Sequence, residues 1–481
     1  MKKNKMLSLK SAAILGAFVA GTAASTVSYA AATIIIVNGN AANVGFNDST
    51  PALPVGGNSG TTLGQQRLIA FQAAAAKWGA TLTSNVPITV LATMEPLSCT
   101  ATAATLGSAG ATQIFSDFPG APLPNSWYGY ALTNKLYGDE ALGDDASPQI
   151  QARFNSNLGQ ANCLPGSPFY LGLDGNAGTA IDMVTVLEHE FAHGLGFQTF
   201  TNGATGAQLA GTPSVWDNFM WDNSTGKRWV DMTNAERAAS SLNFRKLAWT
   251  GPNAVSKVPS VLSLGTQRLS ISGPSAGNTA GDYAIGTASF GVALSSPGVS
   301  GQLMPVVDQT DGTGLACNPF SAVNALAVNG RIALVDRGVC GFAVKAKNAQ
   351  DAGAIGVVVA NNAAGSAPGL GGADPTVVIP VLSISQADAI LLKSKLTKRT
   401  RTSSGVIANL GVDASQYAGA DKLGRPLLYT PTVFEPGSSV SHWDTLATPN
   451  QLMEPAINVD LTHEVTVPKD LTFELLKDIG W

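Results

Sequence analysis

The sequence predicts an α+β domain that is split by an inserted α/β domain. Loop-rich sequence with isolated strands and helices fills the first half of the chain and returns near its end. In between, residues 329–396 alternate between short apolar strands and helices, which is typical of a compact unit with its own core. The expected limits are 31–257 and 408–481 for the divided domain and 258–407 for the insert.

The first thirty residues, 1–30, have the composition of an export signal. Four lysines precede an apolar run at 12–24, and Ser28-Tyr29-Ala30 supplies a small–x–small cleavage site. The apolar run is shorter than the roughly 20 strongly apolar residues of a membrane span. We therefore expect this signal peptide to be removed, leaving a secreted or periplasmic protein without a membrane anchor.

The mature chain is expected to be acidic and sparsely charged. The full chain carries a formal net charge of −4, and removal of the four signal lysines lowers this charge by four. Only 12% of all residues are charged. An acidic surface argues against nucleic acid and anionic membranes as partners, and the oligomeric state stays open.

The four cysteines form no C-x-x-C pair, which argues against zinc-finger and thioredoxin sites. An even number of cysteines in an exported protein predicts two disulfides. Three pairings are possible, and proximity along the chain favours Cys99–Cys163 and Cys317–Cys340.

Half of the four histidines lie within the stretch VTVLEHEFAHGLGFQTF. His189 and His193 are four residues apart, so a helix places both imidazoles on one face, with Glu190 beside them. We expect this helix to begin with a capping box formed by Thr179 and Asp182. Because histidine is so scarce in the chain, chance is a poor explanation for the H-E-x-x-H pattern.

This pattern is the residue set of a catalytic zinc site. Zinc held by three protein ligands keeps a fourth position for water and lowers the pKa of that water to about 7. A neighbouring carboxylate, here Glu190, accepts the proton as general base and returns it to the leaving amine as general acid. The motif therefore predicts peptide hydrolysis with one catalytic zinc ion, while structural calcium stays open.

The third zinc ligand is not evident from the motif alone. In one large group of such enzymes it is a histidine six residues after the second, where this chain has Thr199. Two histidines and several carboxylates remain as alternatives: His442, His463, Glu236, Asp217 and Asp222.

The stretch HEFAHGLGF, followed much later by SHW and then LMEP, resembles the leishmanolysin-type branch of the metzincin zinc metallopeptidases. In that branch the interval between the second and third histidines is greatly lengthened, and a methionine turn follows the third. The resemblance implies His442 as the third ligand, Met453 as the turn methionine and Gly196 as the glycine where the chain bends after the helix. It also implies a zincin-like fold for the divided domain.

The stretch GRIALVDRGVCGFAVKAKNAQDAGAIGVVVANN resembles the protease-associated (PA) domain, an insertion in several classes of exported peptidase. A structureless interval between His193 and His442 would be implausible in a compact domain, whereas a folded insert with adjacent ends is acceptable. The two resemblances therefore support one another.

The leading hypothesis is a secreted zinc endopeptidase that acts on protein or peptide substrates. The main alternative is a binding or adhesion protein on a metallopeptidase scaffold that uses the PA-like domain for recognition. A zinc hydrolase with other substrates is a third alternative. Residues 168–175 are the expected edge strand for an extended substrate.

Overall fold

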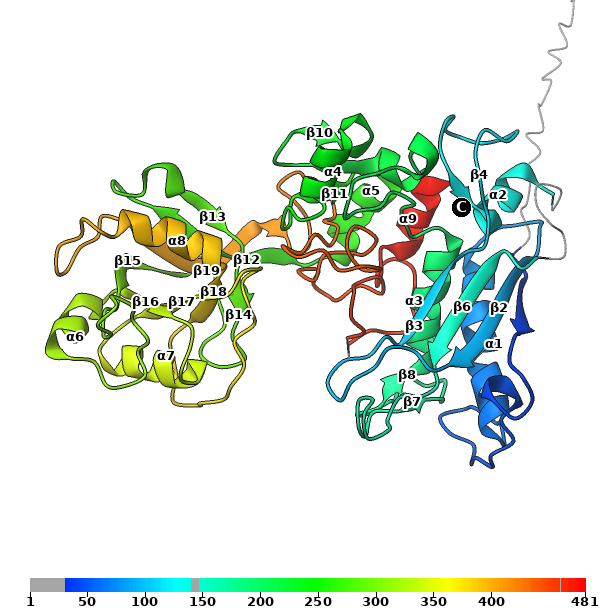
Figure 1. Ribbon diagram of the computed structural model, residues 1–481, viewed down its shortest axis with the longest axis horizontal. Helices are drawn as coiled ribbons and strands as arrows, with labels where there is room; N and C mark the ends of the chain where they lie inside the picture. Colours follow the sequence, from blue (N-terminus) through cyan, green and yellow to red (C-terminus); the bar gives the residue numbers. More distant parts are fainter. Residues whose placement is uncertain (1–30, 140–146, 459) are drawn as a thin grey trace, which may run out of the picture.

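The computed structural model describes residues 31–139, 147–458 and 460–481, which form two lobes (Figure 1). The larger lobe contains the beginning and the end of the described chain, and the smaller lobe contains its middle. The signal peptide expected at 1–30 lies outside the described residues. Within the described residues, no helix is long and apolar enough to cross a membrane.

A four-stranded sheet forms one layer of the larger lobe, in the order β1-β2-β6-β3. Its strands are β1 (Ile34–Asn38), β2 (Ile88–Glu95), β6 (Ile150–Asn155) and β3 (Gly107–Ala111). The first three are parallel, whereas β3 runs antiparallel to β6 at the edge. Buried and partly buried residues alternate along β2, because successive side chains of a strand point to opposite faces.

Two helices, α1 (Leu63–Thr81) and α3 (Met183–Leu195), pack against each other and against this sheet (Figure 1). The hydroxyl of Thr62 caps the first turn of α1. Trp78 of α1 is fully buried, and its indole N–H donates to the backbone oxygen of Glu188 in α3 at 3.0 Å. This bond and the surrounding apolar contacts set the position of α3 behind the sheet.

The end of the chain returns to the larger lobe, where α9 (Thr472–Ile479) packs against α5 (Pro252–Val261). One hydrophobic core includes side chains from both the first and the last part of the described chain. The remaining helices and strands of this lobe are short and are joined by loops. They are α2 (Tyr130–Tyr137), α4 (Asn234–Ser240), β4 (Ile114–Phe115), β5 (Tyr128–Gly129), β7 (Phe169–Tyr170), β8 (Ile181–Asp182), β9 (Met220–Asp222), β10 (Lys227–Arg228), β11 (Leu247–Trp249) and the 3-10 turns η1 (Gly45–Asn47), η2 (Leu209–Gly211), η3 (Trp216–Phe219) and η4 (Trp229–Asp231).

The smaller lobe is built on an eight-stranded mixed sheet in the order β13-β12-β19-β15-β16-β17-β18-β14. Its strands are β12 (Leu264–Ser272), β13 (Gly281–Tyr283), β14 (Gly286–Thr287), β15 (Val299–Pro305), β16 (Ile332–Asp336), β17 (Gly356–Ala360), β18 (Val381–Ile384) and β19 (Ile407–Tyr417). Its helices are α6 (Ala322–Val328), α7 (Phe342–Asp351), α8 (Gln386–Lys395) and the 3-10 turn η5 (Gly277–Thr279).

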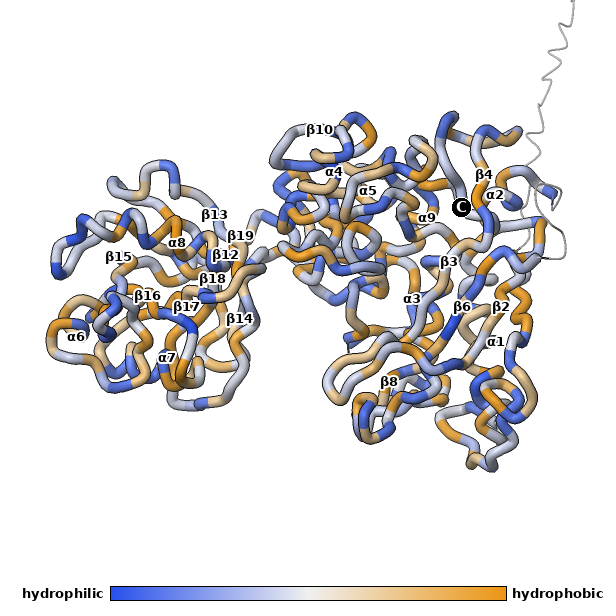
Figure 2. The backbone as a smooth tube through the Cα atoms, viewed as in Figure 1, coloured by the Kyte–Doolittle hydropathy of each residue, from blue (hydrophilic) through white to orange (hydrophobic). Residues whose placement is uncertain are grey.

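Parallel pairing runs from β15 through β16 and β17 to β18. Strands β16, β17 and β18 are buried on both faces, as expected where helices cover a parallel sheet. Two apolar clusters fill this lobe, and both are separate from the core of the larger lobe. Hydrophobic residues are accordingly distributed over both lobes (Figure 2). The strand–helix alternation predicted from the sequence therefore forms an α/β unit with its own core.

The two chain crossings between the lobes lie side by side. β12 and β19 pair along their length, and Ala418 N donates to Ser263 O at 2.9 Å where the strands leave the larger lobe. The expected start of the insert, Val258, belongs to the core of the larger lobe because it lies on the buried face of α5. The expected end, Ile407, is the first residue of β19. The structure therefore puts the insert at about 264–417, since an amphipathic helix does not reveal which core it packs on.

Both disulfides have the pairing expected from proximity, Cys99–Cys163 in the larger lobe and Cys317–Cys340 in the smaller. The first bond joins the loop before β3 to the loop after β6. A backbone hydrogen bond from Leu164 N to Thr100 O, 3.0 Å long, lies beside it. The loop that leads into the edge strand is therefore held at two neighbouring points. No cysteine of the described chain is free.

Candidate metal centre

The helix that carries the H-E-x-x-H motif, α3, is buried along its whole length. It begins after Asp182, whose carboxylate accepts a hydrogen bond from Thr185 N at 2.9 Å. The predicted capping box of Thr179 and Asp182 is wrong, because Asp182 is itself the capping residue and Thr179 lies in the preceding turn. The helix ends at Gly196, which has a φ of 122°. A Cβ there would lie 2.8 Å from Ile479 Cδ1, so the bend requires glycine.

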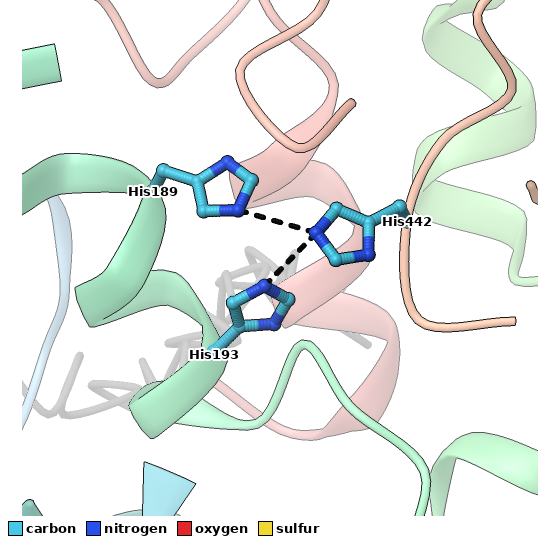
Figure 3. A group of neighbouring side chains, drawn as sticks. All are labelled: His189, His193 and His442. Atoms are coloured by element: carbon cyan, nitrogen blue, oxygen red, sulfur yellow. Dashed lines mark hydrogen bonds between the residues drawn. The ribbon is translucent and has the colours of Figure 1, made fainter. Parts of the chain in front are cut away.

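Three histidines meet at one point of the larger lobe (Figure 3). His189 and His193 come from consecutive turns of α3, and His442 comes from a loop in the last part of the chain. Nε2 of His442 lies 3.2 Å from Nε2 of His189 and 3.2 Å from Nε2 of His193. All three side chains are buried. His442, which is 249 residues after His193 in the sequence, thus lies against the helix.

The outer ring nitrogen of each histidine donates to a backbone carbonyl. The Nδ1 atoms of His189, His193 and His442 lie 2.8, 2.7 and 2.8 Å from the oxygens of Leu452, Phe197 and Ser438, respectively. A carbonyl oxygen only accepts, so the proton of each neutral ring is on Nδ1 and the lone pair is on Nε2. Three Nε2 lone pairs therefore face one another, an arrangement that a cation at their centre would stabilise.

Zinc fits this donor set. Zinc–nitrogen bonds of about 2.0–2.1 Å in a tetrahedral site separate the ligand nitrogens by about 3.3 Å, close to the two 3.2 Å separations. Burial lowers the pKa of His189 to about 4 and that of His193 to about 3. Burial also lowers the pKa of His442 well below its ordinary value. The rings are therefore neutral at neutral pH, which is the form that ligates a metal.

Glu190 lies next to this cluster and against the edge strand. Its side chain is buried, and burial raises its pKa to about 8, although the backbone N–H of Ala109 in β3 donates to it and opposes the shift. A Cβ added at Gly107 would come within 2.9 Å of Glu190 Cγ. The edge strand thus leaves just enough room for the carboxyl group, and it does so because residue 107 lacks a side chain.

The three histidines and Glu190 open onto a cleft of about 1320 Å³. Its lining includes the loop 102–106 with the first half of β3, and residues from the segments 436–442 and 454–458. The lining residues are mostly small or uncharged. Among the described residues that line the cleft, the charged side chains are Asp182, Glu190 and Glu454, and none is lysine or arginine.

The other candidate ligands lie elsewhere. His463 Nε2 is 3.0 Å from Asp182 Oδ1, at the start of α3, and Glu236 forms the capping box of α4. Asp217 accepts hydrogen bonds from Thr199 and Thr201, both at 2.6 Å. Asp222 accepts from Ser224, Thr225 and Ser240. Each of these carboxylates has hydrogen-bond donors of its own, and among the described residues none joins the group formed by the three histidines.

The segment around Met453 packs directly behind the histidines. The methionine side chain is fully buried, and its carbonyl accepts from Trp443 N at 2.8 Å, one residue after His442. The preceding residue, Leu452, supplies the carbonyl that binds His189. This segment therefore contacts the histidine cluster from both sides, at α3 and at the His442 loop.

The edge strand expected at 168–175 stays a prediction, because Gly175 lines the cleft, but β3 is a second and longer candidate. Residues 168–175 contain only the short β7, which pairs with β8, whereas β3 borders the cleft. The sequence of β3, GSAGA, has no β-branched or aromatic residue, so propensity does not mark it as a strand. Its small residues are explained by the closeness of Glu190, which only the tertiary structure shows.

Comparison with known proteins identifies the inserted lobe. Residues 299–392 match the family described as the PA domain. These residues are a PA domain. The match covers most of the lobe between β15 and α8, in agreement with the resemblance seen in the sequence.

Two curated relatives are similar over shorter stretches. Leucine aminopeptidase 2 of Arthroderma otae is 50% identical over 66 residues, 14% of this chain and 13% of that protein. The probable lipoprotein aminopeptidase LpqL of Mycobacterium tuberculosis is 34% identical over 116 residues, 24% of this chain and 21% of that protein. The chain thus spans between an eighth and about a fifth of the length of these relatives.

Among solved structures, a zinc aminopeptidase from Bacillus subtilis is 27% identical, with a TM-score of 0.21. The similarity covers 34% of this chain and 35% of that one.

Proposed function

We propose that the protein is a secreted zinc-dependent endopeptidase. His189, His193 and His442 would hold the ion, and Glu190 would serve as general base and acid. The observation that carries the proposal is the convergence of three Nε2 lone pairs beside a buried glutamate in an open cleft. Bound zinc would polarise the peptide carbonyl and lower the pKa of water at the site. Two relatives named aminopeptidases support peptidase chemistry.

The chain's own groups have definite tasks in this reaction. Each histidine is oriented by the carbonyl at its Nδ1, so the ligand nitrogens need no rearrangement. The Glu190 carboxylate takes a proton from the attacking water and returns it to the leaving amine. Its raised pKa reflects burial, and a nearby cation would favour the ionised form that acts as base.

Cleavage within a chain is favoured by the shape of the cleft. β3 is the outer strand of its sheet, so one side of its backbone is free to pair with an extended peptide. The loop 102–106 continues the same wall past the catalytic glutamate. A peptide paired with β3 would therefore extend to both sides of the metal centre, whereas an aminopeptidase needs a closed end that binds the substrate's amino group.

We also propose that the larger lobe belongs to the leishmanolysin-type metzincins. Supporting features are the bend at Gly196 directly after the zinc helix, the arrival of His442 after a long insert, and the buried Met453 behind the histidines. Export is supported by the two disulfides, which persist in oxidising compartments. In this proposal the PA domain contributes no residue to the catalytic cleft and offers a separate surface.

The test uses the purified full-length mature protein with casein and an internally quenched peptide whose amino end is blocked. Wild type should cleave both, and a chelator should abolish the activity. Glu190→Gln should bind zinc stoichiometrically but lose turnover, and His442→Ala should lose zinc. His463→Ala is the matched control and should retain both zinc and activity.

Three outcomes would contradict parts of the proposal. Cleavage of free but not blocked peptides would identify an aminopeptidase. Stoichiometric zinc without cleavage of any peptide in a broad library would favour the binding protein. Full zinc occupancy of His442→Ala would remove His442 from the ligand set.

A further inference from the structure

Asp470 is a buried carboxylate behind the metal centre that no part of the proposed reaction uses. It lies just before α9, and only 2% of its surface is exposed. Its two oxygens have different partners: Oδ2 accepts from Leu452 N at 2.6 Å, and Oδ1 accepts from Thr472 N at 2.7 Å. One oxygen therefore holds the first turn of α9, and the other holds a residue on a different segment.

That residue, Leu452, is the one whose carbonyl oxygen binds Nδ1 of His189 at 2.8 Å. The N–H on one side of the Leu452 Cα is held by Asp470, and the C=O on the other side faces the histidine ring. Fixing the N–H restricts the rotation of the backbone at Leu452, and with it the direction of the carbonyl. Asp470 is therefore connected to the proposed ligand His189 through a single residue, Leu452.

A second bond docks the same segment onto the start of α9. Leu471 N donates to Oε1 of Gln451 at 3.0 Å, next to the Asp470 bond. Glu454 closes the turn from within, because its Oε1 accepts from Gln451 N at 2.9 Å. Gln451 and Glu454 thus hold the turn together, but among these side chains Asp470 is the one that binds Leu452 itself.

We propose that Asp470 is a positioning residue for the metal centre, which acts by aiming the Leu452 carbonyl at His189. The carbonyl keeps the proton of His189 on Nδ1 and its lone pair on Nε2, directed at His193 and His442. This inference rests on the proposed zinc site. Removal of such a supporting group typically weakens metal binding about 10- to 100-fold.

A purely structural role is the alternative, in which Asp470 only caps α9 through Thr472 N. Its loss would then lower the stability of the protein without changing the zinc affinity of the folded state. Asp478, near the end of the same helix, provides a matched control. Its carboxylate also accepts backbone N–H groups, from Asn253 at 2.7 Å and Ala254 at 3.2 Å, and it touches no residue that binds a histidine.

The experiment compares Asp470→Asn, Asp470→Ala and Asp478→Asn in the full mature protein. The zinc dissociation constant is measured by competition with a chromophoric chelator, well below the unfolding temperature of every variant. We expect about 10- to 100-fold weaker zinc binding for Asp470→Ala, a smaller loss for Asp470→Asn, which keeps one acceptor oxygen, and wild-type affinity for Asp478→Asn. If Asp470→Ala does not fold, Asp470→Asn carries the comparison.

A second readout needs no metal. In the metal-free protein, nitrogen-15 NMR should show His189 as the Nδ1–H tautomer in wild type and a mixture of tautomers in the Asp470 variants. An unchanged zinc affinity and tautomer in both Asp470 variants would overturn the inference, as would an equal loss in Asp478→Asn. If wild type binds no zinc, the proposed function fails, whereas the tautomer measurement still decides the role of Asp470.

Discussion

The hydroxyl of Thr199 donates a 2.6 Å hydrogen bond to the buried carboxylate of Asp217. Thr199 occupies the position six residues after His193, where one large group of enzymes with this motif has a histidine ligand. Its backbone N–H also donates to Ser441 Oγ at 3.3 Å, next to the proposed ligand His442. The position therefore supports the loop that carries the third histidine instead of supplying a ligand itself.

Replacement of Thr199 by valine should destabilise the protein. The change keeps the shape of the side chain but removes one of the donors to Asp217, a fully buried carboxylate. Loss of a partner to a buried acceptor costs about 1–3 kcal/mol in the free energy of unfolding, measured by chemical denaturation. Thr225→Val, at an exposed threonine, should leave that free energy unchanged. Equal unfolding free energies for both variants would refute the role given to Thr199.

Replacement of Gly107 by alanine should impair catalysis without loss of zinc. The added methyl group would lie 2.9 Å from Glu190 Cγ, so the carboxyl group must move. A displacement of this kind is expected to lower kcat about 10- to 100-fold. Gly341→Ala is the control, because no atom lies within 4 Å of the added group. Steady-state kinetics and zinc analysis make the comparison, and an unaltered kcat would show that Glu190 tolerates the methyl group.

The metal-free protein should lose stability in mild acid. Burial lowers the pKa of folded His189 to about 4, whereas the unfolded chain has an ordinary histidine pKa of about 6.5. Between these values the unfolded chain holds a proton that the folded chain lacks, so acid favours unfolding. This contribution is complete above about pH 6.5 and is lost as the pH falls towards about 4.

Chemical denaturation of the metal-free protein across this pH range measures the effect. The free energy of unfolding should fall more steeply for wild type than for His189→Asn, because the acidic groups are common to both proteins. Identical slopes for wild type and His189→Asn would contradict the burial effect.

Excision of the insert should leave the metal centre intact. Ser263 O and Ala418 N are hydrogen-bonded at 2.9 Å, so a short glycine linker can replace residues 264–417. Closing a short gap costs little conformational entropy. No buried residue of the larger lobe's core lies within 264–417, and of the excised residues only the partly buried Tyr417 packs against that core. We expect stoichiometric zinc and cleavage of a short blocked peptide. Loss of zinc from the folded, excised protein would show that the PA domain supports the site.

The local features of the protein can be predicted from the sequence alone. The spacing of His189 and His193 follows from helical periodicity, the strand–helix alternation of the insert from its apolar runs, and both disulfides from proximity. These features depend on residues that are close together in the sequence. The long interval between His193 and His442 in the sequence also predicted a folded insert.

Contacts between distant segments were decided by the tertiary structure. The strand β3 has no strand propensity, and it is recognised only because it pairs with β6 and lies against Glu190. Val258 shows no sign in the sequence of which core it joins. Asp470 and Leu452 meet because two loops fold onto one helix end, and no pattern of residue types predicts that encounter. The sequence determined which groups are candidates for the proposed chemistry, whereas long-range packing determined what surrounds and orients them.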